Sequence, residues 1–245
     1  MIKSSSSPIR RRYIVRLIGR VLILIAGLVL CFLRPEIYDI LDGWRFFDRI
    51  SILHLLWLVW VGDMIEQLWP VGKNVALVSQ KLFRNRFRPI LERVSKEALK
   101  QHLVNAARSA LWVMILWCGL IAVIGILHAA NVIGDIGLFM ITLVFYVCDL
   151  ICVLIWCPFR LIMKNRCCTT CRIFNWDHLM MFSPLLFAGG FYCWSLLLLS
   201  ITVWLVWEGC ILIYPERFWE QTNAALQCAN CTDKLCTQYC QKLRH

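Results

Sequence analysis

The sequence lacks the local motifs that mark the common classes of enzyme. It contains no glycine-rich nucleotide-binding loop, no H-E-x-x-H metal motif and no serine nucleophile elbow. Internal repeats are absent, and the only low-complexity tract is the short serine run at residues 4–7. Outside the apolar runs, no stretch has the about 50 residues that an independent soluble domain needs. We therefore expect one compact membrane domain, and the sequence assigns no reaction to it.

Charged residues are also scarce, at 17% of the 245 residues, whereas 60% of the residues are hydrophobic. Soluble domains are about 45–50% apolar, and the mean hydropathy of this chain is +0.67, so we expect an integral membrane protein. The formal net charge of +11 would suggest a nucleic-acid partner in a soluble protein. Here the basic residues cluster beside apolar runs, so we expect anionic lipid headgroups as their partners and no nucleic acid.

Five apolar runs are long enough to cross the hydrocarbon core of a bilayer, which takes roughly 17–25 helical residues. These predicted spans lie at residues 13–33, 50–68, 110–127, 138–157 and 182–208. The last run continues to residue 214, which is too long for one untilted span. We interpret it as one tilted helix that begins at Ser183 and Pro184 and leaves the core near Glu208. The alternative is a helical hairpin broken at Gly189 and Gly190.

The distribution of Lys and Arg predicts the orientation of these spans, because basic residues near span ends stay in the cytoplasm. The N-terminal segment 1–12 and the connections 69–109 and 158–181 are rich in Lys and Arg. By contrast, the connection 34–49 balances three arginines with four acidic residues, and 128–137 has no Lys or Arg. The first apolar run lacks a small-residue cleavage site, so we expect a retained signal-anchor. The N-terminus is predicted to be cytoplasmic and, with five spans, the C-terminus to lie outside.

The long basic connection is predicted to be helical between residues 74 and 106. Its apolar residues recur near helical spacing with basic residues between them, and Pro89 divides the segment into two helices. Two interpretations are open. The helices form an amphipathic pair in the headgroup layer of the membrane, or they cap the bundle from the cytoplasmic side.

The C-terminal tail, residues 215–245, is rich in cysteine. Its spacing C-x2-C-x4-C-x3-C brings four thiols close together, at Cys228, Cys231, Cys236 and Cys240. Outside the cytoplasm such a set oxidises, and nested pairing of Cys228 with Cys240 and Cys231 with Cys236 is the most hairpin-like connectivity. Inside, the same thiolates suit a zinc ion or an iron–sulfur cluster. The predicted topology favours the disulfides.

A second cluster of cysteines lies in the predicted cytoplasmic loop 158–181. Cys168 and Cys171 form a C-x2-C pair, Cys167 is adjacent, and His178 follows seven residues after Cys171. Flanking arginines favour thiolates, so a metal site or a redox-active dithiol is predicted, with incidental cysteines as the alternative. If the tail were also cytoplasmic, the two clusters would share a compartment and build one larger site.

Ionisable residues inside predicted spans are costly and are candidates for function. Asp149 lies in the middle of the fourth predicted span, where a functional role and a structural hydrogen bond are both open. For His54, Asp63, Glu66 and Glu208 a structural role is favoured. Thus the first functional hypothesis is a membrane protein whose cysteines bind metal or exchange electrons. The second is a non-enzymatic interaction protein with a disulfide-stapled tail, and the third is a small transporter centred on Asp149.

Overall fold

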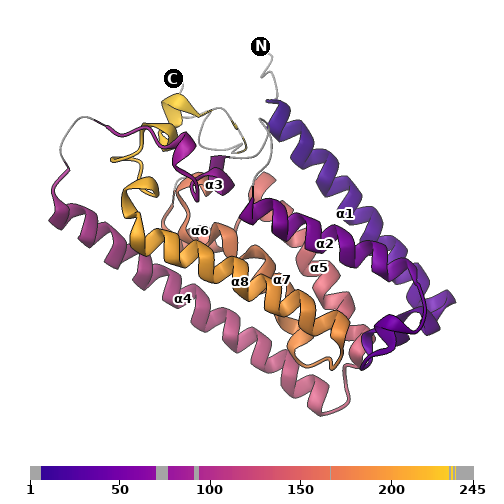
Figure 1. Cartoon of the computed structure of the whole chain (residues 1–245). Coiled ribbons are helices and arrows are strands. Elements are labelled where there is room, and N and C mark those ends of the chain that lie inside the picture. The colour runs from indigo at the N-terminus through magenta and orange to yellow at the C-terminus, as the bar shows by residue number, and fades with distance from the viewer. Residues whose placement is uncertain are drawn as a thin grey trace.

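The structure is a computed structural model, which describes residues 7–69, 77–90, 94–165, 167–231, 233 and 235. Within these residues every element is a helix and there is no strand, which confirms the predicted all-α class. Five long helices run along a common direction (Figure 1). They are α1 (Pro8–Leu33), α2 (Ile52–Leu68), α4 (Lys96–Ala129), α5 (Asp135–Leu154) and α8 (Phe191–Ile213).

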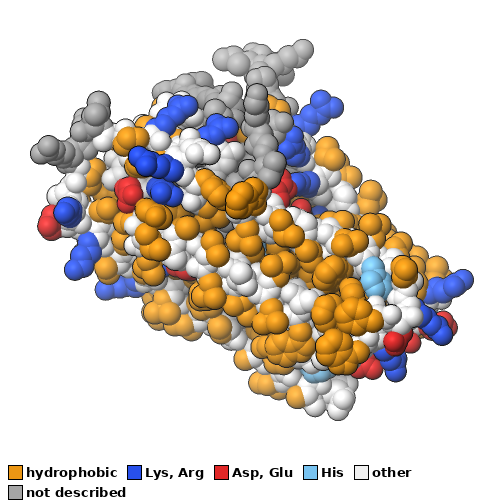
Figure 2. Space-filling model, viewed as in Figure 1, with side chains coloured by type: hydrophobic (Ala, Val, Ile, Leu, Met, Phe, Trp, Pro, Cys, Tyr) orange, Lys and Arg blue, Asp and Glu red, His pale blue; other side chains and the backbone are white. Residues whose placement is uncertain are grey.

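Four of the described helices, α1, α4, α5 and α8, are long and apolar enough to cross a membrane. The fifth, α2, has 17 residues and covers most of the second predicted span. Figure 2 shows hydrophobic side chains across the middle of the visible face, with Lys and Arg gathered at its two ends. This distribution is typical of a membrane-embedded bundle.

Local capping signals explain where several of the long helices begin. Ser51 forms a capping box at α2, in which its hydroxyl accepts from Leu53 N and its own N–H donates to His54 Nδ1 at 2.9 Å. Ser95 caps α4 by accepting from Ala98 N at 3.1 Å. His54 therefore has the structural role that the sequence favoured.

The basic connection between α2 and α4 differs from the predicted helix pair. Its described residues contain only the short helices α3 (Leu77–Gln80) and η3 (Arg84–Arg86), and α4 begins at Lys96 and continues without a break to Ala129. The residues around Pro89 extend along the C-terminal segment instead, where Ala224 N donates to Arg88 O at 2.9 Å. Proline lacks an N–H and ends helices, so Pro89 marks an extended segment. Residues 70–76 and 91–93, which also belong to the predicted pair, lie outside the described residues.

A broken helical segment connects α5 to α8. After α6 (Phe159–Met163) and η4 (Cys168–Thr170), it comprises η5 (Arg172–Trp176), α7 (Asp177–Phe182) and η6 (Ser183–Leu186). At 1.5–2.0 Å per residue these last three helices cover about 25 Å. In Figure 1, α7 lies inside the bundle, and its residues contact both α5 and α8.

This broken segment passes from one end of the bundle to the other. At its start, Arg172 forms an ion pair with Glu208 near the C-terminal end of α8, with 2.6 Å between nitrogen and oxygen. Midway, Ser183 Oγ accepts from Trp117 Nε1 in the interior of α4 at 3.0 Å. At its end, Gly190 forms a bridge with Gly43, in the connection between α1 and α2. The chain therefore crosses the bundle once more than predicted.

The predicted helix 182–208 is wrong at its start, because α8 begins only at Phe191. Ser183 Oγ donates to Met180 O at 2.6 Å and caps no long helix. Gly190 has φ +156°, and a Cβ there would lie 2.2 Å from Leu41 O, so only glycine permits this close approach. The helix is interrupted at Gly189 and Gly190, as in the alternative interpretation of the sequence. However, the residues before the glycines form the broken segment and not the first arm of a helical hairpin.

The two ends of the described chain meet at the same end of the bundle. Ser7 Oγ donates to Asp233 O at 2.5 Å, and the segment after α8 contacts the connection that contains Pro89. The prediction that the two termini lie on opposite sides depended on five crossings. In the structure the broken segment adds a sixth passage along the bundle, and the sides on which the two termini lie stay a prediction.

Candidate functional site

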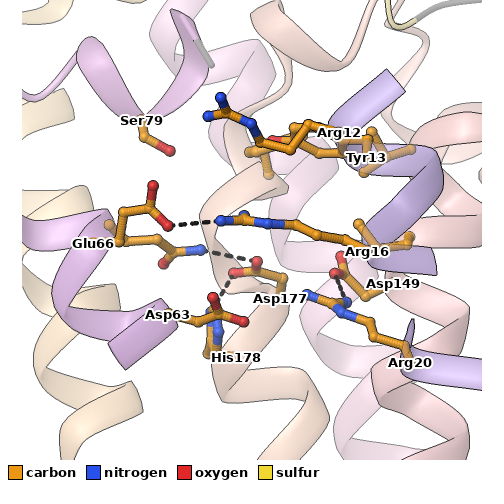
Figure 3. Close-up of a pocket in the computed structure, with 14 residues that line it drawn as sticks. Arg12, Tyr13, Arg16, Arg20, Asp63, Glu66, Ser79, Asp149, Asp177 and His178 are labelled. Atoms are coloured by element: carbon orange, nitrogen blue, oxygen red, sulfur yellow. Dashed lines mark hydrogen bonds and ion pairs between the residues drawn. The ribbon is translucent and has the colours of Figure 1, made fainter. Parts of the chain in front are cut away.

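A charged cavity of about 60 Å³ lies where α1, α2, α5 and α7 meet (Figure 3). A volume of this size holds a few water molecules, since one water needs about 10–15 Å³ of such space. Its ionisable lining residues are Arg12, Tyr13, Arg16, Arg20, Asp63, Glu66, Asp149, Asp177 and His178.

The arginines of α1 reach the cavity because they lie four residues apart, at positions 12, 16 and 20, on one face of the helix. In the sequence analysis these arginines served only to predict the orientation of the first span in the membrane. Asp63 and Glu66 are one turn apart on α2 and face them. Helical spacing identifies each set, but only the fold shows that the two sets meet.

Two ion pairs connect α1 to its neighbours, and they differ in burial. Arg16 and Glu66 are 2.8 Å apart with side chains about two-fifths exposed, so they contribute little to stability. Arg20 and Asp149 are 2.6 Å apart with side chains 8% and 19% exposed. Arg20 also donates to Tyr146 O at 2.7 Å and lies 4.0 Å from the centre of that ring. The mouth of the cavity is thus at Arg16, and Arg20 lies at its floor.

Asp177 and His178 lie at the floor of the cavity on α7. Gln67 Nε2 donates to Asp177 Oδ2 at 2.9 Å. His178 Nδ1 is 3.2 Å from Asp177 Oδ1, within ion-pair distance but without hydrogen-bond geometry. Among the described residues, Asp177 Oδ1, Gln67 Oε1 and both ring nitrogens of His178 are buried without a hydrogen-bond partner. Such atoms are costly unless water or a ligand satisfies them.

The formal charge of the cavity depends on one proton. Three guanidinium groups and four carboxylates line it, together with the His178 imidazole. The lining is neutral when His178 is protonated and carries one negative charge when it is not. Asp63 faces His178 in Figure 3, and its charge acts on both His178 and Arg20.

The structure separates the predicted metal ligands of the loop. His178 lies in the charged cavity, whereas Cys168 and Cys171 line a second, apolar cavity with three cysteines of the preceding segment. Cys167 instead contacts Thr169 Oγ1 at 3.1 Å. No three His, Cys, Asp or Glu side chains in the described part of the chain are grouped as metal ligands.

The tail cysteines are only partly described. Cys228 lies in η9 (Cys228–Asn230) and Cys231 directly follows it, whereas Cys236 and Cys240 lie outside the described residues. The predicted disulfides and the predicted zinc or iron–sulfur site therefore both stay predictions. Cys231 and the cysteine loop lie at the same end of the bundle, which is the arrangement that the larger shared site required.

Glu208 has the structural role that the sequence favoured. It binds Arg172 and also accepts from Trp176 Nε1 at 2.9 Å, while Trp207 Nε1 donates to Arg172 O. These contacts fasten the start of the broken segment to α8. They place the residues that follow, Asp177 and His178, in the interior of the bundle.

Lys81 is a buried basic residue that sequence reasoning did not single out. Its side chain is 3% exposed, donates to Thr169 O and lies 5.2 Å from the Trp207 ring. Burial lowers the pKa of Lys81 to about 8, and the thiols of Cys171 and Cys167 act in the opposite direction. One lysine in a basic connection has no sequence signal that would distinguish it.

Comparisons with known proteins add no relative. No family model, curated protein or solved structure matches the chain. The class is therefore defined by the fold and the site alone. It is a helical bundle with four helices suited to crossing a membrane, and its described interior contains a charged cavity beside a broken helix.

Proposed function

We propose that the chain is an integral membrane protein that transfers protons, alone or together with a solute, through the charged cavity. Four helices support membrane insertion by their length and composition, and α2 together with the broken segment 172–190 completes six crossings. With an even number of crossings, the N-terminus, both basic connections and the C-terminal tail share the cytoplasmic side. The cavity mouth faces that side.

The observation that carries this proposal is the set of unsatisfied polar atoms around His178. Buried polar groups are normally hydrogen-bonded, yet Gln67 Oε1 and His178 Nε2 have no such partner among the described residues, and Asp177 Oδ1 and His178 Nδ1 face each other at 3.2 Å without hydrogen-bond geometry. Intramembrane carboxylates and histidines mark ion and proton pathways. Broken helices form the central sites of many transporters.

In the proposed mechanism His178 exchanges a proton with water that enters the cavity through its mouth at Arg16. The carboxylates of Asp177 and Asp63 stabilise the imidazolium, and Arg20 pairs with Asp149. Beyond the floor, Trp60 and Phe182 are fully buried and close the path. Passage of the proton therefore requires α7 to move, and the short helices on either side of it supply the joints.

Proton flux into proteoliposomes tests this function. The purified chain is reconstituted with a trapped pH-sensitive dye, and a potassium diffusion potential drives proton entry. We expect flux above that of empty liposomes, and a loss of about tenfold or more in His178→Asn, because the exchanging group is removed.

The matched control is His128→Asn. His128 lies outside the cavity, with Nδ1 2.8 Å from Ile133 O, so its replacement should leave flux unchanged. Flux equal to that of empty liposomes, or undiminished flux in His178→Asn, contradicts the proposal. Gel filtration of each variant establishes that it is folded.

One observation favours a second candidate function, thiol redox exchange. The thiols of Cys152 and Cys157 lie close enough to interact, a pair that the sequence did not predict. Oxidation would form a disulfide, with two electrons and two protons passing to a disulfide-bearing acceptor. Alkylation after equilibration with oxidised and reduced glutathione, followed by mass spectrometry, should show this pair oxidising first. A pair that stays alkylatable under oxidising conditions excludes this function.

A further inference from the structure

A second cavity, of about 240 Å³, lies directly beside the charged one. Its walls come from α4, α5, η5 and α7, and they are almost entirely aromatic, aliphatic or thiol. They include Trp117, Phe145, Cys148, Cys152, Phe174 and Met181. Cys148 is exposed, so the cavity reaches the outer surface of the bundle at α5. An apolar cavity open to that surface is accessible to hydrocarbon chains.

The two cavities share part of their lining. Asp149, Val153, Phe174 and Asp177 line both of them. The boundary therefore has two carboxylates on it, with charged groups on one side and apolar groups on the other. This arrangement is complementary to an amphiphile whose head lies at the carboxylates and whose chain fills the apolar cavity.

The charges favour a cationic head. His178 shares the charged cavity with Tyr13 and the three arginines of α1. Four carboxylates also line it, those of Asp63, Glu66, Asp149 and Asp177. With His178 neutral, this lining carries one unbalanced negative charge, which one ammonium group neutralises. Asp177 Oδ1 faces His178 Nδ1 at 3.2 Å. An ammonium head that donates to this carboxylate oxygen therefore takes the place of the imidazolium.

We propose that the two cavities together bind a single-chain cationic amphiphile, a long-chain amine, and that its binding displaces the proton from His178. The amine head binds at Asp177 and the chain lies against Phe174 and Cys152. The N–H bond of the His178 imidazolium breaks as its proton passes to water, and the ammonium charge of the amine replaces the charge of the imidazolium. The exchange rests on the proposed proton transfer, and it identifies the solute that is moved in return.

Photolabelling of the full chain in detergent micelles tests the binding. The probe is hexadecylamine with a diazirine in its chain. We expect saturable labelling on the walls of the apolar cavity, and hexadecylamine should compete about tenfold better than hexadecanoic acid or hexadecanol of equal length. Labelling that does not saturate, or equal competition by the acid, overturns the proposal.

Two matched variants locate the chain. Cys152→Phe fills the apolar cavity and should lower labelling about fivefold or more, because the chain can no longer be buried there. Cys118→Phe introduces the same ring on the exposed surface of α4 and should leave labelling unchanged. If both variants label equally, the chain lies elsewhere and the proposal fails. The head-group competition on the unaltered chain does not depend on how well either variant folds.

Proton release separates this inference from the proposed function. Adding hexadecylammonium chloride at the same pH to the protein in weak buffer should release protons to an indicator dye in the unaltered chain, and His178→Asn should release none. Proton flux in liposomes without saturable amine binding contradicts only the inference. Saturable amine binding and proton release without any flux contradict the proposed function, while the amine site stands.

Discussion

The same helices build two very different interiors at the two ends of the bundle. Near the connection between α1 and α2, the rings of Trp60, Phe139, Phe182 and Tyr192 pack together with almost no exposure. Towards the N-terminal end, α1, α2, α5 and α7 enclose the charged cavity. Tyr146 lies at the boundary, where its ring contacts Trp60 on one side and Arg20 on the other.

The two ends of the bundle have different roles: the aromatic end stabilises the fold, and the charged cavity is the candidate site of function. Well-packed aromatic side chains gain both hydrophobic and ring–ring stabilisation. Buried ion pairs contribute little net stability, because the cost of removing both charges from water offsets their attraction. We therefore expect substitutions at the aromatic end to unfold the chain and substitutions in the charged cavity to change transport.

The largest effect is expected from Trp60→Ala at the aromatic end. Trp60 is fully buried, and removing a buried tryptophan side chain costs about 3–5 kcal/mol of the free energy of unfolding. Trp112→Ala is the control, because Trp112 is 58% exposed on α4. Unfolding in detergent, followed by circular dichroism, measures both variants. Equal stability of the two would show that the aromatic cluster is not the stabilising core.

The Arg20–Asp149 pair should show strong non-additivity. Asp149→Leu leaves Arg20 buried without its carboxylate, which should cost about 3 kcal/mol. The double variant Arg20→Met with Asp149→Leu removes both charges and should recover most of that loss, because neither desolvation cost remains. A double-mutant cycle measures the coupling. Simple addition of the two single losses would show that the pair is not a buried, interdependent unit.

Lys81 should make stability depend on pH. Its pKa is lowered from 10.5 to about 8 by burial, so between these values the unfolded chain binds a proton that the folded chain does not. The stability of the unaltered chain should therefore rise from pH 8 to 10.5 relative to Lys81→Met, by about 3 kcal/mol at most. Melting curves at several pH values measure this difference. A constant difference would show that Lys81 stays charged in the fold.

The smallest effect is expected outside both regions, at Arg45. Its guanidinium lies 3.7 Å from Asp39 and 3.8 Å from Asp42, and all three side chains are more than half exposed. Such pairs contribute little in water, so Arg45→Ala should change the free energy of unfolding by less than about 0.5 kcal/mol. A loss above about 1.5 kcal/mol would indicate that this connection is buried in the assembled protein.

The long helices were predictable from sequence because an apolar run of sufficient length is a strong signal on its own. The broken segment was not predictable. Its pieces are each shorter than a span, and Asp177 and His178 interrupt its apolar residues, so it looked like a polar loop. Its contacts with Glu208 at one end and Gly43 at the other exist only in the folded chain.

The candidate site shows the same limit. Asp149 was identified as a candidate because ionisable groups inside apolar runs are rare, and His178 was identified because it follows the C-x2-C pair. However, the sequence grouped His178 with the nearby cysteines, whereas α7 directs it to the charged groups of α1 and α2. Sequence analysis could group residues only by their proximity along the chain, whereas the broken segment directs His178 and the cysteines before it into different cavities.

The central claim is that residues 172–190 cross the bundle, bringing Asp177 and His178 into the interior and both ends of the chain to one side. Epitope tags placed before Met1 and after His245 test it in intact and permeabilised cells. The account predicts that antibodies reach both tags only after permeabilisation, as expected for two cytoplasmic ends. Detection of the C-terminal tag alone on intact cells would place the ends on opposite sides and contradict the sixth crossing.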